Sequence, residues 1–360
     1  MGVLLLSGTL FMGCGGSKSS NINNLTQAIS FDKSSTDIIY KYLKDVPKNV
    51  QVSIAKIKDG QVHYYGAIHT SKGTVDTIDN HLGAFMIGSI TKIFTSTLLA
   101  QMVIDRKISL DDNIQDKLPF SIHNGIGLRY KQLANHTAGV PTDEILEPLI
   151  INNPKYNEFD NLNYEDLEYY LKNDLDLSVS KGTFSYSNLG VSILGYTLSI
   201  IERKPYKALL KERIFDTLNM HNSSTVRANT NLVSAIMPND GPVPPIYESA
   251  GAIISTVEDL YKFSVASFGD MPEYLLTQKP TVSMNDSIDI GLAWFINKKP
   301  LANQNITWYF HGGATEGYTS IMILDKENQN GIIVLSNLPN DDKTDKITDL
   351  GFELITQMYK

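Results

Sequence analysis

The stretch Phe85-Met86-Ile87-Gly88-Ser89-Ile90-Thr91-Lys92 places a Ser-x-x-Lys motif at the start of an apolar helical pattern. The motif alone carries little weight, because it occurs four times in the chain, beginning at Ser30, Ser53, Ser89 and Ser178. Helical periodicity follows directly only after Ser89, with apolar residues at helix spacing as far as about Asp105. Residues three apart share a face on a helix, so Lys92 is the lysine best placed to act on its serine.

The start of a helix is a chemically favourable place for a serine nucleophile. Its unsatisfied N–H groups and positive potential favour the negative charge that develops beside Ser89. Lys92 would lie one turn deeper, partly desolvated and close to the same positive end, and both influences favour a neutral amine that can accept a proton. On these residues alone, a plain serine N-cap beside a solvated lysine is the alternative interpretation.

Two further clusters carry groups that suit acyl transfer. Tyr186-Ser187-Asn188 follows a turn and begins a helix, so a phenol beside a cationic lysine could relay the serine proton while Asn188 binds a substrate amide. Phe310-His311-Gly312-Gly313-Ala314 ends an aromatic strand, and its paired glycines permit close approach of the backbone to a substrate. An N–H there, together with that of Ser89, would form an oxyanion hole.

In order and spacing these motifs resemble the serine β-lactamase and penicillin-binding peptidase superfamily, in its branch of class C β-lactamases and D-alanyl-D-alanine carboxypeptidases. The resemblance covers roughly residues 30–358. It includes three stretches between the motifs: Asn135–Pro141, Glu212–Phe215 and Ala250–Leu260.

The resemblance implies a role for each matching residue. Ser89 would form an acyl-enzyme, and Lys92 and Tyr186 would share the general-base task. Asn188, His311 and Gly313 would bind the substrate, with His311 forming a polar or cationic wall near Tyr186. The backbone N–H groups of Ser89 and Ala314 would hold the oxyanion. No cofactor and no metal is implied.

Gly312 departs from the family pattern. Where the family has a threonine that helps to bind the substrate carboxylate, this chain has glycine. Three functions therefore stay open. The first is a carboxypeptidase-like penicillin-binding enzyme or a class C-like β-lactamase, acting on a β-lactam or a D-Ala-D-Ala peptide. The second is an esterase or D-amino-acid peptidase on the same fold, and the third is a catalytically weak envelope binding protein.

The order of the predicted elements indicates an α+β fold. A hairpin is expected over residues 49–70, and strands over 291–296, 306–311, 318–324 and 332–336. Helices are expected over 89–105, 164–173, 188–203, 205–217, 256–267 and 341–359. Strands at both ends predict an antiparallel sheet built from about 30–88 and 285–358 and flanked by helices, with a largely helical insertion over about 89–284 and a site in the cleft between them.

The N-terminus resembles a bacterial lipoprotein signal. A ten-residue apolar run over 3–12, too short to span a membrane, leads to Cys14 and a polar tether that extends to residue 29. Phe11 stands where leucine is usual, and no basic residue precedes the run. We expect a signal over 1–13 and lipidation of Cys14, which would anchor the domain to the membrane at the cell envelope, facing the periplasm or the cell exterior. The alternative is an apolar strand or frayed tail with an incidental cysteine.

Composition excludes several other classes. With 31 Lys and Arg against 39 Asp and Glu, the chain of 360 residues carries a net charge of −8, which disfavours nucleic acid as a partner. Because Cys14 is the single cysteine, no intrachain disulfide can form, and the cysteine clusters typical of structural zinc sites are absent from the sequence.

Overall fold

The computed structural model describes residues 32–142, 153–236, 241, 243–297, 306–339 and 345–360. Cys14, the predicted signal and the tether lie outside the described residues. Within them, no helix is both long and apolar enough to cross a membrane.

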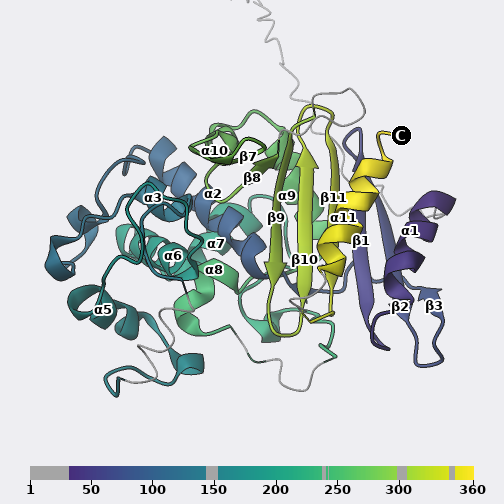
Figure 1. Cartoon of the computed structure of the whole chain (residues 1–360), viewed down its shortest axis with the longest axis horizontal. Coiled ribbons are helices and arrows are strands. Elements are labelled where there is room, and N and C mark those ends of the chain that lie inside the picture. The colour runs from purple at the N-terminus through teal and green to yellow at the C-terminus, as the bar shows by residue number, and fades with distance from the viewer. Residues whose placement is uncertain (1–31, 143–152, 237–240, 242, 298–305, 340–344) are drawn as a thin grey trace, which may run out of the picture. The chain divides into compact units, whose positions relative to one another are not determined.

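An antiparallel sheet joins the two ends of the chain, as predicted (Figure 1). Its strand order in the described chain is β3-β2-β1-β11-β10-β9-β8-β7-β6. The central pairing is between β1 and β11, in which Val52 lies opposite Ser336 and Ile57 opposite Gly331. The strands are β1 (Gln51–Lys58), β2 (Gln61–His69), β3 (Val75–Thr77), β6 (Val282–Asn285), β7 (Ile288–Ile290), β8 (Phe295–Asn297), β9 (Trp308–Ala314), β10 (Thr319–Asp325) and β11 (Asn330–Ser336).

Helices cover both faces of the central strands, which explains why β10 and β11 are buried along their whole length. In Figure 1, α11 (Lys346–Gln357) lies in front of the sheet, where it contacts α1 (Lys33–Leu43), and α9 (Val257–Phe268) lies behind it. The contact with α11 is close, since a Cβ on Gly351 would lie 2.6 Å from Ile321 Cγ2. On the opposite face, Met322 and Leu324 join the main hydrophobic core.

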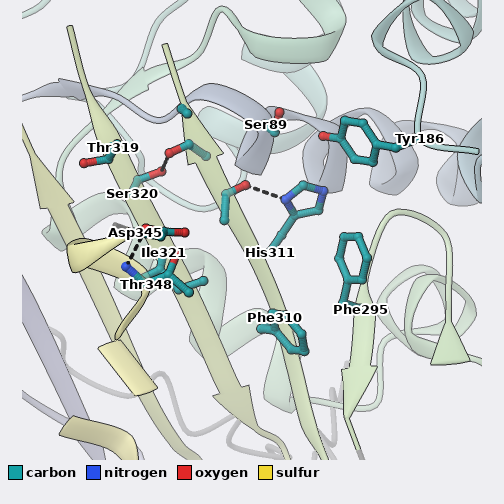
Figure 2. Close-up of a pocket in the computed structure, with 13 residues that line it drawn as sticks. Ser89, Tyr186, Phe295, Phe310, His311, Thr319, Ser320, Ile321, Asp345 and Thr348 are labelled. Atoms are coloured by element: carbon teal, nitrogen blue, oxygen red, sulfur yellow. Dashed lines mark hydrogen bonds between the residues drawn. The ribbon is translucent and has the colours of Figure 1, made fainter. Parts of the chain in front are cut away.

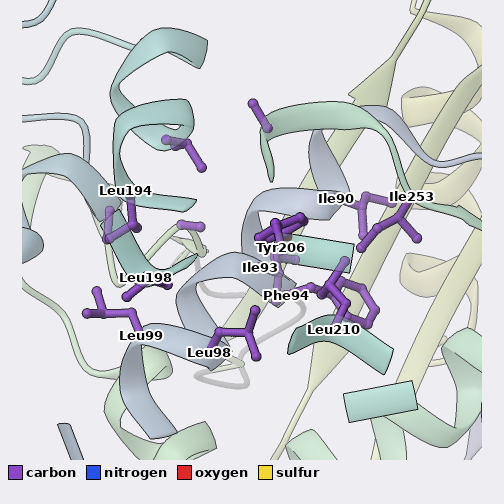
Figure 3. Packing of buried hydrophobic residues seen from close by; sticks show 14 of the residues in the cluster. Ile90, Ile93, Phe94, Leu98, Leu99, Leu194, Leu198, Tyr206, Leu210 and Ile253 are labelled. Atoms are coloured by element: carbon purple, nitrogen blue, oxygen red, sulfur yellow. The ribbon is translucent and has the colours of Figure 1, made fainter. Parts of the chain in front are cut away.

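The helical region packs around two helices that are buried on nearly all sides, α2 (Thr91–Ile104) and α6 (Asn188–Glu202). Figure 3 shows apolar side chains of both helices meeting those of their neighbours. A Cβ on Gly195 of α6 would lie 2.2 Å from Ser249 Cβ, so glycine is needed where α6 contacts α8 (Glu248–Gly251). The remaining helices are α3 (Tyr130–Ala134), α5 (Tyr164–Asn173), α7 (Tyr206–Leu210) and α10 (Pro272–Gln278).

The structure confirms most predicted elements and corrects two. The predicted strand over 291–296 is wrong at its start, because a turn separates β7 from β8. Gly291 N–H donates to Trp294 O at 2.8 Å, and Ala293 adopts a left-handed φ of 67°. The helix predicted over 205–217 is α7 followed by a π-helical turn at Lys211–Phe215, because its hydrogen bonds widen by one residue.

Candidate active site

The turn that carries Ser89 is held between the sheet and the helical region. It follows a two-stranded pairing of β4 (Phe85–Met86) with β5 (Ile254–Ser255) and forms a short 3-10 helix, Gly88–Ile90, before α2. Gly88 has φ +49°, and a Cβ there would lie 2.6 Å from Ala314 N. The backbone of Ala314 at the end of β9 therefore lies directly against the nucleophile turn.

Two contacts from the sheet fix this turn in place. Ser320 Oγ of β10 donates to Ile87 O at 2.9 Å. A Cβ on Gly313 would lie 2.0 Å from the same carbonyl oxygen, so β9 can approach only because the residue is glycine. The second glycine of the sequence motif is thus required by the packing of β9 on the nucleophile turn.

Lys92 lies beneath Ser89, where it is fully buried. Its Nζ is 2.8 Å from Ser89 Oγ and also 2.8 Å from Ala250 O, at the end of α8. The carbonyl oxygen of Ala250 can only accept, so it fixes one N–H of the amine and keeps the nitrogen within reach of the serine. This pair meets the distance required between a nucleophile and its base.

Tyr186 lies on the other side of Lys92, in the segment that leads into α6. Lys92 Nζ is 5.0 Å from the centre of its ring. The ring packs between two imidazoles, with centroids 4.4 Å from that of His136 and 6.2 Å from that of His311. The structure thus brings together the serine, the lysine, the tyrosine and the histidine that the sequence motifs predict.

His311 is a neutral wall of this site, which corrects the cationic alternative. Burial, together with the charge of Lys92, lowers the pKa of His311 to about 3. Its Nδ1 donates to Gly312 O at 2.6 Å, so in the neutral ring Nε2 is an acceptor. Nε2 is buried and has no hydrogen-bond partner among the described residues.

His136 is a site residue whose position the sequence did not indicate. Its Nδ1 accepts from the N–H of Ser187 at 3.2 Å. Burial lowers its pKa well below the usual value, so it too is neutral. The tilted ring contact with Tyr186 depends on tertiary packing, because 50 residues separate the two positions in sequence.

A cavity of about 400 Å³ opens in front of Ser89 (Figure 2). Two of the predicted residues, Lys92 and Asn188, do not line the cavity. Lys92 is buried beneath Ser89, and Asn188 is the first residue of α6. The cavity is also lined by residues that lie outside the predicted motifs, among them Phe295, Asp345 and Thr348. The lining residues are Ser89, Tyr186, Phe295, Phe310, His311, Gly312, Gly313, Ala314, Thr319, Ser320, Ile321, Asp345 and Thr348.

The competing Ser-x-x-Lys motifs have other partners where the structure describes them. Ser53 Oγ donates to Asn80 O, whereas Lys56 pairs with Asp32. Lys181 donates to Gly127 O. Ser30 lies outside the described residues. Of the four motifs, the one at Ser89 is the one for which the described structure gives a contact between the serine and the lysine.

Comparison with known proteins shows the family of the chain. The Beta-lactamase family model matches residues 42–352. The chain is similar to a beta-lactamase of Psychrobacter immobilis, with 22% identity over 80% of this chain and 79% of the relative. It is also similar to beta-lactamase-like protein 2 of Dictyostelium discoideum, with 26% identity over 79% of this chain but only 54% of the relative.

Solved structures share the fold. A class C beta-lactamase from Rhodobacter sphaeroides superposes with a TM-score of 0.75 at 17% identity, covering 91% of this chain and all of the other. A beta-lactamase/D-alanine carboxypeptidase from Yersinia pestis superposes with a TM-score of 0.73 at 19% identity, covering 91% of this chain and 99% of the other.

Proposed function

Because the chain belongs to the beta-lactamase family of serine hydrolases, we propose that it cleaves an acyl substrate through a covalent intermediate on Ser89. The observation that carries the proposal is the buried amine of Lys92 at 2.8 Å from Ser89 Oγ. A serine hydroxyl is a weak nucleophile unless an adjacent base takes its proton, and a desolvated amine can do so.

The proposed reaction has two steps. Ser89 Oγ attacks the carbonyl carbon, and its proton passes to the pair formed by Lys92 and Tyr186. The backbone N–H groups of Ser89 and Ala314 stabilise the oxyanion. When the tetrahedral intermediate collapses, the bond to the leaving group breaks and the leaving group receives the proton. Water then attacks the acyl-enzyme with the same groups as base, which releases the acid and restores Ser89.

The similar proteins make β-lactams and D-alanyl-D-alanine peptides the first substrates to test. Gly312 favours a second candidate, an esterase or D-amino-acid peptidase. A Cβ at position 312 would meet no atom closer than 3.7 Å, so, unlike Gly313, this glycine is not required by the packing of the backbone.

The test is mass spectrometry after incubation with a fluorescent penicillin, followed by an assay with nitrophenyl esters. The proteins are the wild type, Ser89→Ala and a control, Ser178→Ala, in which the exposed serine of another Ser-x-x-Lys motif is removed. We expect reaction with at least one reagent in the wild type and the control, and none in Ser89→Ala. A stable penicillin adduct supports a penicillin-binding peptidase, and rapid turnover supports a lactamase.

The remaining outcomes also decide between candidates. Ester hydrolysis that depends on Ser89, without reaction with penicillin, supports the esterase. Reactivity that survives in Ser89→Ala shows that another residue is the nucleophile. A wild type that reacts with neither reagent supports the third reading, a catalytically weak binding protein.

We also propose that Cys14 is lipidated and anchors the enzyme at the cell envelope, facing the periplasm or the cell exterior. The support is the apolar run followed by Gly13-Cys14 and a polar tether. In a bacterial host fed labelled palmitate, the wild type should incorporate label and sediment with membranes, whereas Cys14→Ser should do neither. Equal distribution of the two proteins contradicts the anchor.

A further inference from the structure

We propose that Asp345 makes the cavity select against substrates that carry a carboxylate near the reacting carbonyl, in favour of neutral and, above all, amine-bearing acyl compounds. The inference rests on the proposed function, because it concerns the cavity in front of Ser89. It chooses among the substrates that the family resemblance leaves open, and it assigns the choice to Asp345.

The first observation is the charge of the cavity wall. Among the described residues that line it, Asp345 is the acidic one, and neither lysine nor arginine is present. His311, the remaining group that could be cationic, is neutral. Lys92 lies behind Ser89, and Lys346, next to Asp345, donates to Asp45 O at 3.2 Å. The cavity therefore offers an anionic substrate group no opposite charge from its described walls.

The second observation concerns the helix end at this cavity. The N-terminus of a helix attracts anions because its first N–H groups are unpaired. In α11, however, Asp345 occupies this position, and its Oδ1 accepts from the N–H of Thr348 at 3.0 Å. The protein's own carboxylate thus takes the place in which a substrate carboxylate would be stabilised, and it would repel a second one.

The same helix end lies beside the position where the sequence departs from the family. Thr348 Oγ1 is 3.7 Å from where a Cβ on Gly312 would lie. Gly312 pairs with Ile321 on the α11 side of β9, whereas the neighbouring His311 pairs with Met322 and points to the other face of the sheet. Asp345 and His311 thus line the same cavity from the two sides of β9 (Figure 2). Among the described residues that line this part of the cavity, a carboxylate would find no cation. The hydroxyl that it would meet belongs to Thr348, on the helix that Asp345 caps.

The third observation is the unused acceptor on the other side of the cavity. His311 is 97% buried, and its Nε2 has no hydrogen-bond partner among the described residues. A neutral imidazole nitrogen and a carboxylate both accept hydrogen bonds. At His311 Nε2 the cavity therefore matches N–H donors, such as an amine or amide, and mismatches a carboxylate, which can only accept.

The test uses three phenylboronic acids that differ only in the meta substituent: carboxylate, carboxamide or aminomethyl. Boronic acids bond reversibly to an active serine, so calorimetry measures their dissociation constants without turnover. We expect the aminomethyl compound to bind best and the carboxamide to bind about tenfold or more tightly than the carboxylate at low salt. The preference should shrink at high salt, which screens the charge of Asp345.

Substitutions at the start of α11 test the role of Asp345. Asp345→Asn and Asp345→Ser each keep a side chain that can cap the helix while removing the charge, so the ratio of carboxamide to carboxylate affinity should fall about tenfold. Asp349→Asn is the matched control, because it removes the same charge from the same helix at an exposed position that does not line the cavity. Its ratio of carboxamide to carboxylate affinity should equal that of the wild type.

The outcomes separate the two proposals. Binding that is absent, or that persists in Ser89→Ala, overturns the proposed function and with it the inference. Ser89-dependent binding that is tightest for the carboxylate overturns the role of Asp345 alone. So does a ratio that changes no more in the two Asp345 variants than in Asp349→Asn.

Discussion

At the scale of single residues, the site depends on how Lys92 is held. A fully buried amine is costly unless its hydrogen-bonding groups are satisfied, and here Ser89 Oγ and Ala250 O each lie at 2.8 Å. The sequence identified the pair because three-residue spacing on a helix brings the two side chains together. It could not identify Ala250 as a partner, since 158 residues separate it from Lys92.

Lys92→Met tests this role, because methionine retains most of the buried volume while the amine is lost. We expect acylation of Ser89 to slow by about 10² to 10⁴, the usual contribution of a general base. The rate is measured by stopped flow with whichever reagent labels the wild type. The control is Lys56→Met, which removes the lysine of another Ser-x-x-Lys motif. Its acylation rate, corrected for the fraction of folded protein, should equal that of the wild type. Equal acylation rates in Lys92→Met and the wild type would remove Lys92 from the mechanism.

At the scale of elements, the nucleophile turn is positioned by strands on both sides. β4 pairs with β5, and β9 and β10 contact Ile87 and Gly88 through Gly313, Ala314 and Ser320. The pairing of β4 with β5 was not predicted, because strands of two residues are too short to show a periodic pattern. The sequence predicted that the paired glycines of β9 let the backbone approach a substrate. The structure shows that Gly313 lets β9 approach Ile87 O, and that Gly88 does the same for Ala314.

Gly88→Ala should therefore damage both folding and catalysis. The left-handed φ costs about 1–2 kcal/mol for a residue with a Cβ, and the new atom would force Ala314 or the turn to move. A displacement of this kind can lower the acylation rate about 10²-fold. Urea unfolding and acylation kinetics measure the two effects.

Gly73→Ala is the matched control for this substitution. Gly73 has φ +83°, and a Cβ there would meet nothing within 4 Å. Its variant should show the backbone cost without the loss of acylation. If both variants acylate at the wild-type rate, the contact between Gly88 and Ala314 does not position the site.

At the scale of the whole molecule, the cavity lies where the sheet meets the helical region. Tyr186 comes from the segment before α6, His311 from β9 and Asp345 from the start of α11. When the sheet packs against the helical region, two imidazoles, His136 and His311, are buried in their neutral form. The stability of the whole fold is therefore linked to pH through residues of the site.

The direction of this linkage follows from the lowered pKa values of the two histidines. In the unfolded chain a histidine takes up its proton near pH 6.5, whereas His311 in the folded chain does so only near pH 3. Between these values the unfolded state binds more protons. Above about pH 6.5 the two histidines should not lower the free energy of unfolding. As the pH falls below this value, each histidine should lower the free energy of unfolding by up to about 1.4 kcal/mol per pH unit.

Urea unfolding at pH 8, 6.5, 5.5 and 4.5 checks this prediction. His136→Asn and His311→Asn should each reduce the loss of stability between pH 6.5 and 4.5. The stability that each substitution removes at pH 8 serves as the reference, because both imidazoles are neutral there in the folded and the unfolded state. Losses as large as that of the wild type in both variants would show that other groups cause the pH dependence.

The sequence by itself determined the fold class and predicted the nucleophile motif, because both depend on local periodicity and on motif order along the chain. Hairpin and helix patterns predicted the sheet of terminal strands, and the helix after Ser89 distinguished one Ser-x-x-Lys from three others. Only the tertiary structure decided what surrounds the serine. The ring contact of His136 with Tyr186, the neutrality of His311 and the charge of Asp345 at the cavity wall all depend on contacts between residues far apart in sequence, and on the burial that those contacts create.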